Sequence, residues 1–156
     1  MADLPIMKSP DFENFSLLPI VHNLLYSLGI TGKYVGFFHT TYAAFLTFYQ
    51  PERLLLIIKW LYPDIAKHYN TSWKNVERSI RTVASIAWEF RPDVLCRMAM
   101  RSLDCWPTNS SFIFILAAHL RSAVLYTVSV DGTPRSAHLP LWHTYPYIYP
   151  HRVGSS

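Results

Sequence analysis

Apolar residues recur along this chain at the three- and four-residue spacing of an α-helix, and polar or proline-containing breaks separate the periodic segments. From Leu17 to Leu28 the spacing predicts one helix, which Gly29 ends. The same pattern predicts further helices over Lys33–Tyr49, Glu52–Leu61, Asp64–Tyr69, Trp73–Phe90, Asp93–Ser102 and Phe112–Tyr126. No fixed-period repeat or heptad run is present in the sequence. The pattern therefore predicts an all-α fold of about six helices around a helix-turn-helix, with a mostly irregular C-terminal tail.

Composition divides the chain into three parts. Residues 1–16 carry two prolines and no helical periodicity, which indicates a loose leader. Residues 17–126 hold the periodic segments and form the expected helical domain. Residues 127–156 carry four prolines and the aromatic run Trp142–Tyr147, which indicates an irregular tail. Asp131 and Gly132 leave open a hairpin turn within that tail.

The segment LYPDIAKHYNTSWKNVERSIR, residues 61–81, has the features of a helix-turn-helix. Ala66 is a small residue suited to the crossing of two helices. Asn70, four positions later, tolerates the left-handed backbone conformation that a tight turn needs. Thr71 or Ser72 can cap the second helix. The apolar residues expected to hold the two helices together are Ile65, Tyr69, Val76 and Ile80.

The second helix of this pair separates apolar from cationic side chains. Its buried stripe is expected to consist of Val76, Ile80, Val83, Ala84 and Ala87. At about 100° per residue, the opposite face carries Lys74, Arg78, Arg81 and Ser85. Residues of the preceding elements that can flank this face are Lys59, Lys67 and His68. This is the face that a helix-turn-helix protein turns toward the major groove.

Two interpretations of this face remain open. Lys and Arg neutralise phosphates, and Asn75, Glu77 and Arg78 form a mixed set of side chains that can read base edges. The alternative is a solvated charged helix, in which Glu77 pairs with Arg81 one turn later instead of accepting from a base. The net charge of +4 and the pI near 9.1 suit a polyanionic partner without requiring one. Charged residues make up only 15% of the chain, so the argument rests on where they cluster.

Other classes of function find no support in the sequence. Cys96 and Cys105 lack further ligands at metal-binding spacing, and so do His138, His143 and His151 in the tail, so we expect no metal site. No phosphate-binding glycine loop or nucleophile motif is present, which argues against an enzyme, a cofactor and a small-molecule substrate. The N-terminus does not resemble a signal peptide, and polar residues break every charge-free stretch, so we expect a cytoplasmic protein that does not enter membranes.

The main alternative to DNA binding is a helical protein-interaction module whose helix-turn-helix no longer binds DNA. In that case the aromatic segment Tyr34–Tyr49 and the tail would contact a protein partner. Large apolar side chains are mostly buried, so the interpretation that we favour is that the same aromatics fill the core.

The segment from residue 61 to residue 81, followed by Ala87 and Trp88, resembles the DNA-binding effector domain of the sporulation initiation response regulators, the stage-zero master transcription factors of endospore-forming bacteria. A second block starts at Pro107, reads PTNSSFI and continues to Ala117 and Leu120-Arg121, and it is similar to the last helix of that family. The resemblance covers about residues 24–121. It implies an all-helical domain that inserts a recognition helix into the major groove of double-stranded DNA, often as tandem copies on adjacent half-sites.

Carried over by position, the resemblance implies DNA contacts from Lys67, Glu77, Arg78 and Arg81. Together with the residues chosen from the helical faces and caps, the expected DNA-binding set is Lys67, Thr71, Ser72, Lys74, Asn75, Glu77, Arg78 and Arg81. The departures from the family pattern are also specific. Asn75 stands where the family usually has Arg; if that Arg reads a guanine, we expect Asn75 either to weaken the preference or to shift it toward adenine. Thr41 and Tyr42 replace Arg and Glu, and Ser111 replaces Glu.

The family places this domain after a phospho-acceptor receiver domain. The residues before Leu17 are too few for a parallel α/β unit, so we expect no phospho-acceptor role for Asp3 or Asp11. Two interpretations stay open: the chain is a free-standing effector domain, or it is a fragment of a longer protein.

Overall fold

A computed structural model describes the backbone of residues 17–129 and the side chains of residues 17–124. The six α-helices of this part of the chain are α1 (Leu17–Ser27), α2 (Val35–Tyr49), α3 (Tyr62–His68), α4 (Trp73–Phe90), α5 (Pro92–Ala99) and α6 (Asn109–Ser129). A 3-10 segment, η1 (Pro51–Leu56), and a π-helical segment, η2 (Ile57–Leu61), join α2 to α3. The described residues contain no strand, which confirms the all-α fold. The predicted leader, the tail after residue 129 and the hairpin at Asp131 lie outside the described residues.

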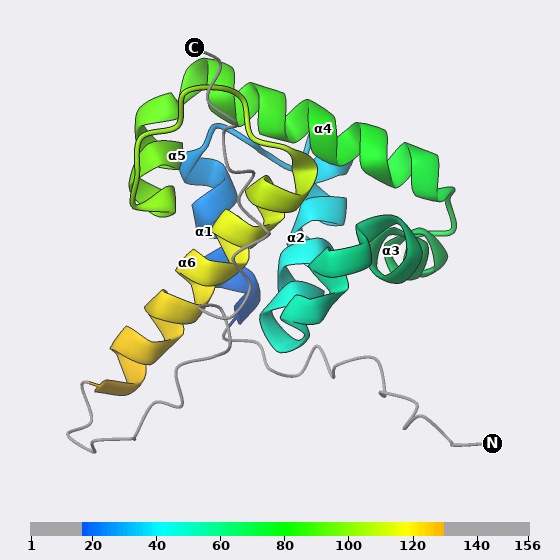
Figure 1. The fold of residues 1–156 in the computed structure, drawn as a ribbon, viewed down its shortest axis with the longest axis horizontal. Coiled ribbons are helices and arrows are strands. Elements are labelled where there is room, and N and C mark those ends of the chain that lie inside the picture. The colour runs from blue at the N-terminus through cyan, green and yellow to red at the C-terminus, as the bar shows by residue number, and fades with distance from the viewer. Residues whose placement is uncertain (1–16, 130–156) are drawn as a thin grey trace, which may run out of the picture.

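Helix α2 lies at the centre of the domain. It packs against α1, α4 and α6, while α4 runs along one edge with α3 beneath one of its ends and α5 at the other (Figure 1). Nearly every residue from Gly36 to Thr47 is buried, so the aromatic side chains Phe37, Tyr42 and Phe45 fill the core. This supports the core interpretation of that segment over the partner-binding one. The exposed exception is Phe38.

The crossing of α2 over α4 depends on a glycine. A Cβ atom on Gly36 would lie 2.3 Å from the backbone oxygen of Ser79 and 2.7 Å from Cγ1 of Val83. Carbon atoms do not approach a backbone oxygen that closely, so any larger residue would force the two helices apart. The face of α4 that meets α2 is the predicted stripe, and all five of its residues are buried: Val76, Ile80, Val83, Ala84 and Ala87.

The expectation of one regular helix over residues 52–61 is wrong. The chain forms a 3-10 turn and then a π-helical turn, with Leu56 between them at φ −134° and ψ 63°. Five consecutive apolar residues, Leu54–Ile58, give no amphipathic stripe that would favour a regular helix. Arg53 stabilises this irregular backbone through three contacts. It donates to the Gln50 side chain at 2.6 Å and to the Trp60 carbonyl at 2.7 Å, and it forms an ion pair with Asp64.

Several predicted helix ends are shifted. Helix α3 starts at Tyr62 with Pro63 in its first turn, and α5 ends at Ala99 because Met100 takes the left-handed conformation at φ 55°. Helix α6 begins at Asn109 and continues to Ser129, beyond the predicted end at Tyr126. Its start follows from Thr108, whose Oγ1 accepts from the Ser111 N–H at 3.2 Å.

Candidate nucleic-acid interface

The turn between α3 and α4 has the geometry predicted from the sequence. Asn70 adopts φ 51°, the left-handed conformation. The Thr71 N–H donates to the Ala66 carbonyl at 2.9 Å, and the Asn70 N–H donates to that of Lys67 at 3.4 Å. These two hydrogen bonds form a Schellman motif, which ends α3 and turns the chain into α4. The sequence therefore determines the angle at which the two helices leave the turn.

Ser72 is the residue that caps α4. It has an extended backbone, φ −94° and ψ 152°, and its Oγ accepts from the Asn75 N–H at 3.2 Å. The hydroxyl of Thr71 has a different role, because it accepts from the side-chain amide of Asn75 at 3.2 Å. Asn75 thus projects from the first turn of α4 with its Nδ2 engaged, and its Oδ1 has no hydrogen bond to any described residue.

The outward face of α4 carries exposed cations. Lys74, Arg78 and Arg81 are all exposed, as predicted from the helical period. The Lys74 ammonium lies 5.7 Å from the ring centre of Trp73, which keeps that side chain over the start of the helix. The Arg78 guanidinium has no ion-pair partner among the described residues. Lys74 and Arg78 are thus the cations of this face that form no ion pair with a carboxylate of the described residues, whereas Arg81 does.

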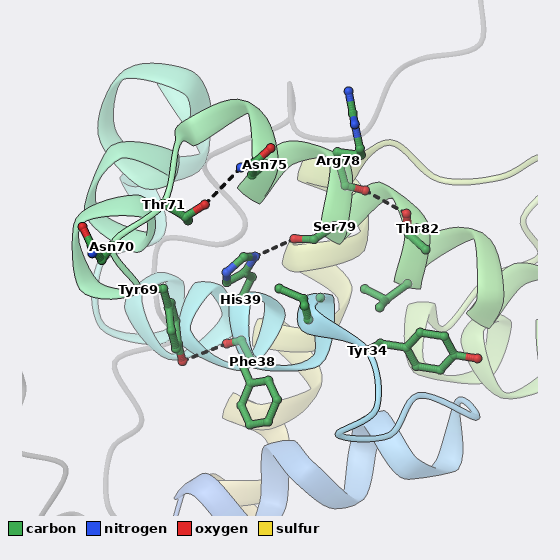
Figure 2. Close-up of a pocket in the computed structure, with 13 residues that line it drawn as sticks. Tyr34, Phe38, His39, Tyr69, Asn70, Thr71, Asn75, Arg78, Ser79 and Thr82 are labelled. Carbon is green, nitrogen blue, oxygen red and sulfur yellow. Dashed lines mark hydrogen bonds between the residues drawn. The ribbon is translucent and has the colours of Figure 1, made fainter.

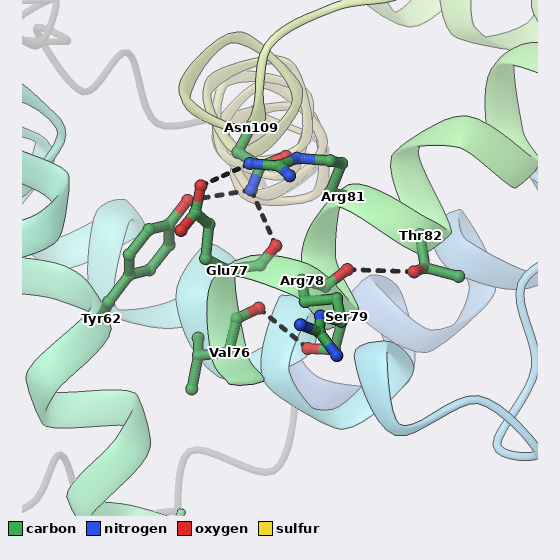
Figure 3. A network of polar contacts seen from close by, with 8 residues as sticks. All are labelled: Tyr62, Val76, Glu77, Arg78, Ser79, Arg81, Thr82 and Asn109. Carbon is green, nitrogen blue, oxygen red and sulfur yellow. Dashed lines mark hydrogen bonds and ion pairs between the residues drawn. The ribbon is translucent and has the colours of Figure 1, made fainter. Parts of the chain in front are cut away.

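Glu77 and Arg81 form an ion pair across one turn of α4 (Figure 3). The pairing alternative for Glu77 is therefore what the structure shows. Its carboxylate is partly buried, with 30% of the side chain exposed. Because both groups lie near solvent, the pair contributes little to stability and can open when another partner is offered.

The flanking residues expected near this face are placed differently from one another. Lys67 is exposed at the end of α3, next to the turn. His68 stacks on the Tyr42 ring, with centroids 4.3 Å apart, so it belongs to an aromatic cluster against α2. Lys59 lines a small groove of about 290 Å³ with Arg53 and Asp64. Of the two lysines, Lys67 is the one closer in sequence to α4.

Asn109, at the start of α6, connects α6 to both helices of the helix-turn-helix. Its Nδ2 donates to the Tyr62 hydroxyl at 2.9 Å and to the Glu77 carbonyl at 3.0 Å (Figure 3). One side chain at the start of α6 thereby holds α3 and α4 together. Burial raises the pKa of Tyr62, as expected for a hydroxyl enclosed in the core beside this amide. No sequence pattern signals these contacts, because they join residues 32 and 47 positions apart.

A second polar contact that the sequence did not predict joins α2 to α4. His39 is buried, and its Nδ1 lies 2.6 Å from the Ser79 Oγ. Ser79 gives its hydroxyl proton to the Val76 carbonyl at 2.9 Å, so the ring N–H of His39 is the donor to Ser79. Burial lowers the pKa of His39, which favours this neutral form.

Beside this contact lies the α2–α4 groove, a hollow of about 780 Å³ (Figure 2). Its walls come from the start of α2, from the turn after α3 and from α4, and include the expected DNA-binding residues Thr71, Asn75 and Arg78. A second hollow of about 460 Å³ lies against Glu77 and Arg81. Helix α4 therefore stands as a ridge between two grooves.

The described residues contain no group of three or more His, Cys, Asp or Glu placed to hold a metal ion, and no helix among them is long and apolar enough to cross a membrane. The three tail histidines lie outside the described residues.

Comparison with protein families agrees with the geometry. The family described as Sporulation initiation factor Spo0A C terminal matches residues 21–120, which run from α1 into α6 and include the whole helix-turn-helix. It is a family of DNA-binding domains of transcription factors and not a family of enzymes. The chain belongs to the Spo0A C-terminal family and carries the DNA-binding effector domain of a sporulation regulator.

Proposed function

We propose that this domain binds duplex DNA sequence-specifically by inserting α4 into the major groove, and that it regulates transcription in the cytoplasm of a bacterium. The observation that carries the proposal is the exposed ridge of α4, on which Lys74 and Arg78 project opposite a fully buried stripe. An α-helix with its side chains is about 10–12 Å across, and the major groove is about 12 Å wide. A helix standing as a ridge between two hollows fits that groove while the DNA strands pass on either side.

We assign the residues two kinds of contact. Lys67, Thr71, Ser72 and Lys74 surround the turn and the first residues of α4, where they contact phosphates and set the orientation of the helix. Farther along α4, Arg78 reaches base edges, and Glu77 and Arg81 do so once their ion pair opens. The free Arg78 guanidinium supports this division because it needs no protein partner to be released before it binds.

Asn75 is assigned to adenine. Bidentate binding of adenine needs the Nδ2 as donor and the Oδ1 as acceptor. The Oδ1 is free of described partners, and the Nδ2 keeps one N–H for the base, because only one of its two N–H groups is needed for the Thr71 hydroxyl. We expect Asn75→Arg to change the preferred base from adenine to guanine. Selection from random duplexes with both proteins checks this, and an unchanged site would remove Asn75 from base recognition.

The salt dependence of binding tests the proposal as a whole. The expected result is an affinity that falls steeply with salt, with a slope reduced by about 0.9 for each phosphate-binding Lys replaced by Ala. Arg78→Ala is expected to weaken binding by about 1–3 kcal/mol and to relax the preference at one position. Lys59→Ala, an exposed cation away from this assignment, is the matched control and should leave both quantities unchanged.

The competing function is the protein-interaction module. It predicts that duplex binding is weak, shows no sequence preference and is unaffected by Arg78→Ala.

We also propose that two copies bind adjacent half-sites. This predicts that the protein binds cooperatively to a duplex carrying two selected sites, compared with a duplex carrying one.

A further inference from the structure

The α2–α4 groove has the size and the chemistry of a small-molecule site. Its volume of about 780 Å³ lies within the range of ligand pockets, about 300–1,000 Å³. Tyr34, Phe38 and Tyr69 are among the residues that line it, and Figure 2 shows the Tyr69 ring beside His39. The Tyr69 hydroxyl donates to the Phe38 carbonyl at 3.2 Å, and this hydrogen bond links the turn after α3 to α2. A flat aromatic molecule would find apolar surface there.

His39 gives the groove a specific hydrogen-bond acceptor. The side chain is only 4% exposed, yet it lines the groove. Its Nδ1–H is used by Ser79, which leaves a lone pair on Nε2 with no hydrogen-bond partner among the described residues. Figure 2 shows this second nitrogen on the ring edge opposite Ser79, on the side of the Tyr69 turn. The Tyr69 ring, with its centroid 5.1 Å from that of His39, helps hold the imidazole in place.

The residues that line the groove include one cation, Arg78, which has no ion-pair partner among the described residues. None of the residues that line the groove is acidic. A carboxylate or phosphate at the rim would therefore meet positive charge alone.

We propose that the α2–α4 groove binds a small aromatic anion that carries a hydrogen-bond donor, with its ring against the Tyr69 ring, its donor on the His39 Nε2 and its anionic group at Arg78. Such a ligand covers Arg78 and Asn75, so it competes with DNA. This regulatory consequence rests on the proposed DNA binding, while the site itself does not.

Binding of three naphthalene probes to the full chain tests the site. The first, 6-hydroxy-2-naphthoate, has the ring, the donor and the anion, whereas 2-naphthoate lacks the donor and 6-hydroxy-2-naphthamide lacks the charge. We expect 6-hydroxy-2-naphthoate to bind about five- to tenfold more tightly than either control, the effect of one added hydrogen bond or of one charge-assisted contact. Equal affinities for the three probes, or no saturable binding up to about 1 mM, would overturn the site.

Two variants locate the binding. The amide of His39→Asn can still donate to Ser79 in place of Nδ1 but has no group where Nε2 lies, so 6-hydroxy-2-naphthoate and 2-naphthoate should bind it equally. Val35→Trp covers the groove from an exposed position at its rim and should abolish binding. Leu55→Trp, an exposed residue of η1 outside the groove, is the matched control. Binding to the Val35 variant as strong as to the Leu55 variant contradicts the site, even if the His39 variant fails to fold.

Competition with a selected duplex separates this proposal from the proposed function. The expected result is an apparent Kd for DNA that rises in proportion to one plus the ratio of probe concentration to probe Kd. Simultaneous binding of probe and duplex overturns the coupling. Duplex binding without probe binding means that the groove accommodates only the DNA backbone, and it overturns the site while DNA binding stands. Probe binding without duplex binding refutes DNA binding and leaves the site intact.

Discussion

Removing the Asn109 side chain should loosen the helix-turn-helix from the rest of the domain. Asn109→Ala deletes one hydrogen bond to the Tyr62 hydroxyl and one to the Glu77 carbonyl. A neutral hydrogen bond contributes about 1 kcal/mol. The Glu77 carbonyl keeps its helical bond within α4, so little is lost there, whereas the Tyr62 hydroxyl, on a residue 2% exposed, loses its donor. The expected destabilisation is about 1.5–2 kcal/mol.

Urea unfolding of the full chain, followed by circular dichroism, measures this loss. A destabilisation of about 2 kcal/mol corresponds to a fall in melting temperature of about 8–12 °C for a domain of this size. Ser110→Ala is the matched control, because Ser110 is the next residue of α6 and its hydroxyl has no hydrogen bond to a described residue. We expect that variant to unfold within about 0.5 kcal/mol of the wild type.

A double-mutant cycle with Tyr62→Phe isolates the bond between the two side chains. If that bond dominates, the double variant loses less than the sum of the single ones, with a coupling energy of about 1 kcal/mol. Effects that add to within about 0.3 kcal/mol, or an Asn109→Ala protein as stable as the wild type, would refute the assignment of Asn109 as the connection between α6 and the helix-turn-helix.

Three further predictions concern the backbone and the buried histidine. Gly36→Ala should lower the free energy of unfolding by about 2 kcal/mol or more, because the new Cβ meets the Ser79 backbone oxygen at 2.3 Å; Gly32→Ala, whose Cβ has its nearest neighbour at 3.8 Å, should be tolerated. Met100→Gly should raise the free energy of unfolding, measured in urea, by about 1 kcal/mol, because glycine has no steric penalty at φ 55° and the Met side chain is 90% exposed. Met100→Ala should not raise the free energy of unfolding. Burial lowers the pKa of His39 from its ordinary value of 6.5. The stability that the neutral histidine contributes is therefore complete above pH 6.5 and is lost as the pH falls below 6.5. The loss of stability between about pH 7.5 and pH 5.5 should therefore be smaller in His39→Asn than in the wild type, and equal losses would contradict the assignment.

Local signals in the sequence predicted the helix-turn-helix well. The 3.6-residue period of α4 identified its five buried residues, and Asn70 and Ser72 marked the turn and the cap, because each of these choices depends on residues within one helical turn. The same reasoning failed over residues 52–61. There a continuous apolar run carries no period, and the contacts of Arg53 with Gln50, Trp60 and Asp64 decide the backbone path.

By itself, the sequence determined an all-helical domain of the Spo0A C-terminal family and the face of α4 that carries Lys74, Arg78 and Arg81. Only the tertiary structure decided that Arg81 pairs with a carboxylate while Lys74 and Arg78 do not, that Asn109 of α6 contacts α4, and that His39 lines a groove beside α4. The physical reason is how far apart along the chain the interacting residues lie. Helical period and capping act between neighbours along the chain, whereas the Asn109 and His39 contacts join residues more than 30 positions apart and exist only once the helices have packed.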